Sequence, residues 1–112
     1  MLLAEHGGGS GVRDRGLLDS ALARPKQKYA YEPDTSIFAL AAAYSFGIAK
    51  NHPFVDGNKL TAFVTGTLFL ELNGYTLNAS EPGTAIAFEK LASGQLEENE
   101  LAGWFEEHCI KA

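Results

Sequence analysis

Residues 52–60 read His52-Pro53-Phe54-Val55-Asp56-Gly57-Asn58-Lys59-Leu60, and they separate two apolar segments of helical character. The stretch combines a proton acceptor, a carboxylate, a Gly-Asn turn and a cation. Because the residue before a proline avoids the helical region, we expect His52 in extended geometry. It should project from a helix end or loop rather than share a helix face with Asp56. Phe54 is expected to bury its ring and hold the loop rigid.

The segments on either side of this loop predict two long helices. Upstream, Asp34 is expected to cap a helix that runs to about Asn51. Its apolar residues fall three and four apart: Ile37, Leu40, Ala41, Tyr44 and Ile48. Downstream, a helix is expected from residue 57 or 58 through Leu72, ended by Asn73-Gly74. Apolar residues on more than one face of this second helix predict a central, buried element.

The N-terminal part predicts one shorter helix. Asp14 can cap a helix through about Ala23, where Arg24-Pro25 should stop it, and residues 26–33 should form a loop. Residues 1–6 resemble the last turns of a helix, which predicts that an upstream turn or two is missing; the alternative is a short, frayed terminus.

The C-terminal part predicts a short extended link and two more helices. Residues 75–78 are expected to form a brief strand or link. Ser80, with Pro82 in the first turn, should begin a helix that ends at Gly94. Residues 97–110 should form a last helix with Leu101, Trp104, Phe105 and Cys109 (or His108) towards the core. The pattern predicts an all-α, compact helical bundle.

Length and composition predict one ordinary globular domain over residues 1–112. The chain is 46% hydrophobic and 21% charged, with a net charge of -5, which argues against a nucleic-acid partner. Cys109 is the single cysteine, which fits a reducing compartment and a cytoplasmic location. The longest apolar run, residues 37–49, is too short to cross a bilayer, and the start has no signal-peptide pattern, so we expect no membrane partner.

The residue types in the loop point to phosphate chemistry. A helix that starts at Gly57-Asn58 offers free backbone N–H groups and the positive end of its dipole to an anion. Lys59 adds a compact positive charge, and Asp56 can hold Mg²⁺, which prefers a carboxylate combined with phosphate oxygens. An imidazole such as that of His52 is a natural general base for a hydroxyl nucleophile. Together they predict phosphoryl or nucleotidyl transfer.

The same stretch resembles the signature of the Fic/Doc superfamily, which has a histidine, a phenylalanine, an acidic residue and Gly-Asn, followed by two further positions. Most Fic proteins have glycine and arginine at these two positions, whereas death-on-curing (Doc) toxins have lysine and arginine. Lys59 therefore makes the chain resemble the Doc branch. Residues 11–25 and 69–75 are also typical of Doc-like proteins, and the family usually has one more N-terminal helix.

The resemblance implies a specific activity. Doc toxins are kinases that use ATP and Mg²⁺ to phosphorylate a threonine of elongation factor Tu, which stops translation, and their partner is a Phd-type antitoxin whose C-terminal segment folds onto the toxin. By the resemblance, His52 is the catalytic base and Asp56 the metal carboxylate. Asn58 and Lys59 are catalytic positions that also bind phosphate. Gly57 and Leu60 complete the phosphate- and nucleotide-binding positions.

Leu60 departs from the family pattern, because the family has an arginine that clamps phosphates at this position. Leucine donates no hydrogen bond, and losing one such preorganised contact typically costs about 10²–10³ in rate. Three functions therefore stay open: a weakened Doc-like kinase, a catalytically silent binding module, and a Fic-type AMP transferase. Lys59 favours the kinase over the AMP transferase, and Leu60 favours the binding module.

Several of these residues also have structural interpretations. Asp56 could simply cap the following helix. Lys59 could be a solvated residue of the first turn, and Leu60 could be a core residue, because it precedes Phe63 and Val64 by three and four positions. Arg13 and Asp14 could be only loop and cap, or could dock a target.

Overall fold

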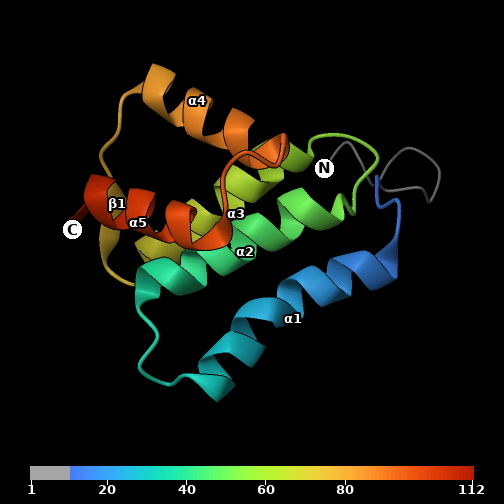
Figure 1. The fold of residues 1–112 in the computed structure, drawn as a ribbon, viewed down its shortest axis with the longest axis horizontal. Helices are drawn as coiled ribbons and strands as arrows, with labels where there is room; N and C mark the ends of the chain where they lie inside the picture. The colour runs from blue at the N-terminus through green and yellow to red at the C-terminus, as the bar shows by residue number, and fades with distance from the viewer. Residues whose placement is uncertain (1–10) are drawn as a thin grey trace.

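The computed structural model describes residues 11–112, and over this range five helices pack together, with a small two-stranded ribbon at one edge (Figure 1). The elements are α1 (Arg15–Tyr31), α2 (Ile37–Asn51), α3 (Asn58–Leu72), β1 (Tyr75–Leu77), α4 (Glu81–Ala92), α5 (Glu98–His108) and β2 (Cys109–Lys111). Most of the described residues are helical, which confirms the predicted all-α class. The predicted helix end at residues 1–6 lies outside the described residues. No helix within residues 11–112 is both long and apolar enough to cross a membrane.

The central element is α2, which contacts α1, α3 and α5. Small residues where the helices cross allow α1 and α3 to approach α2 closely. A Cβ added at Gly47 would lie 3.3 Å from the Ala21 backbone of α1, and one added at Gly66 of α3 would lie 2.1 Å from the Ser45 Oγ of α2. The Ser45 hydroxyl donates to the carbonyl of Ala62 at 2.6 Å, so this buried hydroxyl has a hydrogen-bond partner where α2 and α3 meet.

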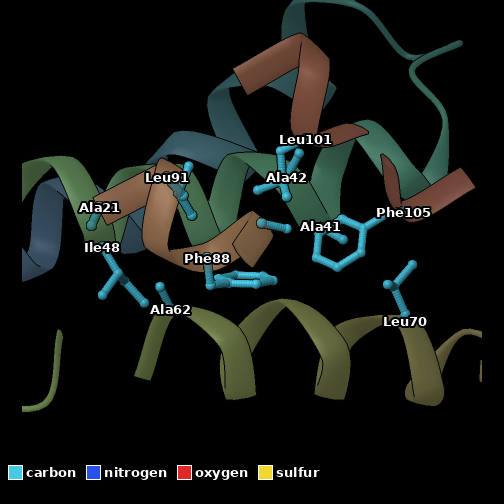
Figure 2. Close-up of a cluster of buried hydrophobic side chains, with 11 residues drawn as sticks. Ala21, Ala41, Ala42, Ile48, Ala62, Leu70, Phe88, Leu91, Leu101 and Phe105 are labelled. Atoms are coloured by element: carbon cyan, nitrogen blue, oxygen red, sulfur yellow. The ribbon is translucent and has the colours of Figure 1, made fainter. Parts of the chain in front are cut away.

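All five helices contribute to one core (Figure 2). Its labelled members are Ala21, Ala41, Ala42, Ile48, Ala62, Leu70, Phe88, Leu91, Leu101 and Phe105. Helix α3 does pack against α2, as predicted for a central element, but its predicted burial on more than one face is wrong. Helix α3 buries one narrow stripe and exposes Leu60, Val64, Leu68 and Leu72. The sequence shows how apolar each face is, but not which faces the rest of the chain covers.

The predicted end of the first helix at Arg24-Pro25 is also wrong, as is the loop over residues 26–33, because α1 continues through Pro25 to Tyr31. Pro25 is buried, so packing outweighs the lost backbone hydrogen bond. Arg24 and Lys28, one turn apart, form ion pairs with Glu98 of α5, which hold the second half of α1.

Two other boundaries differ from the prediction. Ser36, not Asp34, caps α2, with its hydroxyl accepting from the Ala39 N–H at 3.0 Å. Helix α5 ends at His108, because residues 109–111 pair antiparallel with β1 instead of continuing the helix. The pairing partner lies far away in the sequence, so the local pattern could not reveal it.

The remaining caps are confirmed. Asp14 caps α1, accepting from the Leu17 N–H at 2.9 Å. Ser80 caps α4 with Pro82 in the first turn. Asn73 ends α3, and the predicted short strand follows as β1.

Candidate active site

The predicted loop joins α2 to α3, and it begins with an unusual backbone at His52. This residue is the C-cap of α2 and has φ 53° and ψ 52°, in the left-handed region. The expected extended geometry is therefore wrong, although His52 does lie at a helix end, away from any helix face shared with Asp56. The left-handed turn lets the His52 N–H bond the Ile48 carbonyl at 3.0 Å, which completes the helix end. For a residue other than glycine this conformation costs on the order of 1–3 kcal/mol, and such strain gathers at functional sites.

A second segment of chain braces the loop. Val12 forms an isolated antiparallel bridge with Phe54, and the Val55 N–H donates to the Gly11 carbonyl at 2.7 Å. The backbone before α1 therefore runs alongside the loop between α2 and α3. The half-buried Phe54 packs against the core, in agreement with its predicted anchoring role.

The Asn58 side chain stabilises the loop by bonding its backbone at Phe54. Its side-chain oxygen accepts from the Phe54 N–H at 3.0 Å, and its amide nitrogen donates to the Phe54 carbonyl at 2.9 Å. These two bonds fix the orientation of the amide group, and the same nitrogen lies 3.2 Å from Nδ1 of His52. An amide nitrogen can only donate, so Nδ1 of His52 accepts, and the neutral ring carries its proton on Nε2. Asn58 is 6% exposed, so in this arrangement its side chain is part of the loop structure.

The start of α3 leaves backbone donors without acceptors. Gly57 is the N-cap, with φ 77° and no side chain to cap the helix. The first intrahelical bond runs from the Thr61 N–H to the Gly57 carbonyl. The amides of residues 58–60 have no acceptor within the described part of the chain. These donors, with the helix dipole behind them, are suited to bind an anion.

Lys59 and Leu60 occupy the first turn of α3 and are both exposed. The Lys59 ammonium bonds a Glu89 carboxylate oxygen of α4 at 2.8 Å, so its charge is at the site but paired. Leu60 is 65% exposed, which shows that the core interpretation of this residue is wrong. A longer polar side chain at this position would therefore displace no core packing.

These residues line one cavity of about 330 Å³. Its lining consists of Ala49, His52, Asp56, Gly57, Asn58, Lys59, Leu60 and Ala92. All six positions predicted for the site meet here. Ala92, at the end of α4, was missed because nothing local ties it to the loop. A larger groove of about 730 Å³ runs between α3 and α4 and shares Lys59 and Leu60 with the cavity.

Asp56 fits the predicted magnesium ligand. Its carboxylate is exposed on the cavity, and Oδ1 accepts from the Gly57 N–H at 2.8 Å. Residues 11–112 contain no group of three or more His, Cys, Asp or Glu side chains that could hold a metal ion by themselves. An ion on Asp56 would take its other oxygens from phosphate and water, which is the coordination that Mg²⁺ prefers.

The sequence comparisons agree with this architecture. The model of the Fic/DOC family matches residues 1–70, and the chain belongs to this family. It is 45% identical over 74 residues to Toxin Doc of Mycolicibacterium smegmatis, covering 65% of this chain and 57% of that protein. It is 32% identical over 100 residues to Protein kinase doc of Escherichia phage P1, covering 89% of this chain and 79% of that protein.

Replacing Asn58 with alanine is expected to lower the free energy of unfolding by about 1–3 kcal/mol, because the backbone groups of Phe54 lose their partners in a part-buried loop. The His52 ring should also lose its preference for the proton on Nε2. Denaturant unfolding and ¹⁵N spectra of the ring measure the two effects. Asn73→Ala is the matched control, since the Asn73 side chain makes one exposed bond, to the Phe69 carbonyl. Equal stability losses in both variants would contradict the prediction.

Proposed function

We propose that the chain is a Doc-like toxin whose cavity binds the phosphates of ATP for transfer to a protein hydroxyl. The observation that carries the proposal is the start of α3. Its amides at residues 58–60 have no acceptor within residues 11–112, and they lie on one cavity with Lys59, Asp56 and an exposed imidazole. The names of the two relatives, a Doc toxin and a protein kinase, support the same function.

Each residue has a distinct role in this proposal. The amides of residues 58–60 and Lys59 bind and orient the phosphates, and Asp56 holds the Mg²⁺ that accompanies ATP. ATP supplies the γ-phosphoryl group, which bonds the target oxygen while ADP leaves. His52 takes the proton of the target hydroxyl. Because Nδ1 of His52 accepts from Asn58, proton transfer requires the ring to release this bond and present an unprotonated nitrogen to the target.

The partners follow from the family rather than from the cavity. We propose a threonine of elongation factor Tu as the target, a Phd-type antitoxin as the neutralising partner and the cytoplasm as the location. The relative named Toxin Doc supports a toxin–antitoxin pair. The proposal needs neither a nucleic acid nor a membrane.

Leu60 supports a second candidate, a binding module that retains the cavity without transfer. A Fic-type AMP transferase is the third. ATP labelled separately at the α- and γ-phosphates, incubated with the protein, Mg²⁺ and elongation factor Tu, separates all three. Label from the γ-phosphate on the target indicates a kinase, and label from the α-phosphate indicates AMP transfer. Bound ATP without label on the target indicates a binding module.

Titration with ATP and Mg²⁺ is expected to shift the backbone amide signals of residues 57–60, because the amides of residues 58–60 gain an acceptor and Gly57 lies beside them. Lys59→Met should weaken binding, since it removes the cation at the cavity. Lys90→Met is the matched control, because Lys90 is exposed on α4 and does not line the cavity. Shifts confined to another surface would overturn the proposed anion site.

A further inference from the structure

The backbone at His52 is held from outside its own loop. Within residues 11–112, His52 is the one residue other than glycine with a positive φ, and it precedes a proline. Its ring is exposed, so packing around the ring does not impose this conformation. The contacts that do impose it must act on the backbone of residues 51–53.

Arg13 makes most of these contacts, and the Asp14 N–H adds one to the Pro53 carbonyl at 3.1 Å. The Nε of Arg13 donates to the His52 carbonyl at 2.9 Å, and its Nη2 donates to the Asn51 carbonyl at 3.1 Å. Its backbone N–H donates to the Pro53 carbonyl at 2.7 Å. One residue therefore bonds three consecutive carbonyls where α2 ends.

These carbonyls suit a cation. The last carbonyls of a helix have no partner within the helix, and the negative end of the dipole is there. The planar fork of a guanidinium can bond two carbonyls at once, whereas the single nitrogen of lysine cannot reproduce that geometry. Arg13 does not line the cavity, so any effect it has on the site passes through residues 51–53.

We propose that Arg13 is a positioning residue for His52: its guanidinium holds the left-handed turn and so keeps the imidazole at the cavity. The importance of this for catalysis rests on the proposed function, in which His52 is the base. The positioning itself does not rest on it.

The test compares Arg13→Ala and Arg13→Lys with Arg24→Ala. Arg24 joins α1 to the rest of the fold, through Glu98 and the Phe46 ring, and its side chain makes no hydrogen bond to residues 51–53. All three variants can lose stability, whereas only the Arg13 variants should change His52. The direct measurement is the HN–Hα coupling of His52, which reports φ, together with its ring signals.

We expect Arg13→Ala to shift the His52 coupling away from the left-handed value and to broaden or split the ring signals. Arg13→Lys, which keeps the charge, should give an intermediate change, and Arg24→Ala should give none. In a Leu60→Arg background, Arg13→Ala should lower the transfer rate by about 10²-fold, the effect of a misplaced catalytic group, with the KM for ATP unchanged.

An unchanged coupling in both folded Arg13 variants would overturn the proposal. If Arg13→Ala does not fold, Arg13→Lys alone decides the question by the same coupling. If the coupling changes as expected while no variant transfers phosphate, the positioning role stands and the proposed kinase activity fails. If the coupling changes equally in Arg24→Ala, Arg13 has only a general stabilising role and the proposal is wrong.

Discussion

Leu60→Arg is expected to raise the rate of phosphate transfer by about 10²–10³, the usual effect of one preorganised contact to developing charge. Leu60 lies in the first turn of α3, lines the cavity and is 65% exposed, so an arginine fits without loss of packing. Its planar fork of donors suits phosphate oxygens. The measurement is transfer of γ-label from ATP to elongation factor Tu, and expression of the variant should become toxic unless an antitoxin is present.

Two variants control this gain. His52→Ala in the Leu60→Arg background should abolish it, because the proposed base is gone. Leu68→Arg makes the same chemical change two turns along α3, on the groove but away from the cavity, and should give no gain. A folded Leu60→Arg protein that neither labels a target nor becomes toxic would reject the weakened-kinase proposal, and the binding module would then be the better description.

Gly66→Ala is expected to destabilise the fold by about 1–3 kcal/mol, the usual range for an overpacked core. The new Cβ would lie 2.1 Å from the Ser45 Oγ, 3.1 Å from the Phe105 ring and 3.2 Å from the Ala41 carbonyl oxygen. Ser45 cannot simply rotate away, because its hydroxyl then loses the bond to the Ala62 carbonyl. Thermal unfolding should show a fall in Tm on the order of 10 °C.

Gly103→Ala is the matched control for this prediction. Gly103 lies in α5, and a Cβ there would meet no atom within 4 Å. Alanine favours the helix over glycine by about 0.5–1 kcal/mol, so this variant should be as stable as the parent or slightly more stable. A Gly66→Ala protein as stable as the parent would show that α2 and α3 can separate freely at this crossing.

The sequence predicts the helices best where their ends are set locally. Asp14 and Ser80 each cap a helix by accepting a hydrogen bond from an amide three residues ahead. The cap and its partner therefore lie within one short sequence window, which makes the helix start predictable. Prediction fails where contacts with a segment distant in the sequence determine the secondary structure. Pro25 stays in α1 because it is buried in the packed fold, and residues 109–111 become a strand because β1 pairs with them.

In the site, too, the locally determined features are predictable and those that depend on distant segments are not. Its predicted positions meet because they are nearly contiguous, so one loop carries them to one cavity. The contributions of Arg13 and of Glu89 and Ala92 come from other elements, and no local pattern connects them to residues 52–60. The exposure of Leu60 could not be predicted either, because apolar spacing predicts burial whether or not another helix covers that face of α3.

The ribbon of β1 and β2 has a consequence for how the chain unfolds. It pairs Leu77 with Cys109 and Tyr75 with Lys111, so α4 and α5 form an excursion whose two ends lie side by side. A two-stranded pairing is marginal in water by itself, and closing so long a loop costs entropy. The ribbon should therefore open together with α4 and α5, as one cooperative unit of partial unfolding. Hydrogen exchange of its backbone amides is then a measure of how often the C-terminal third of the molecule detaches from the rest.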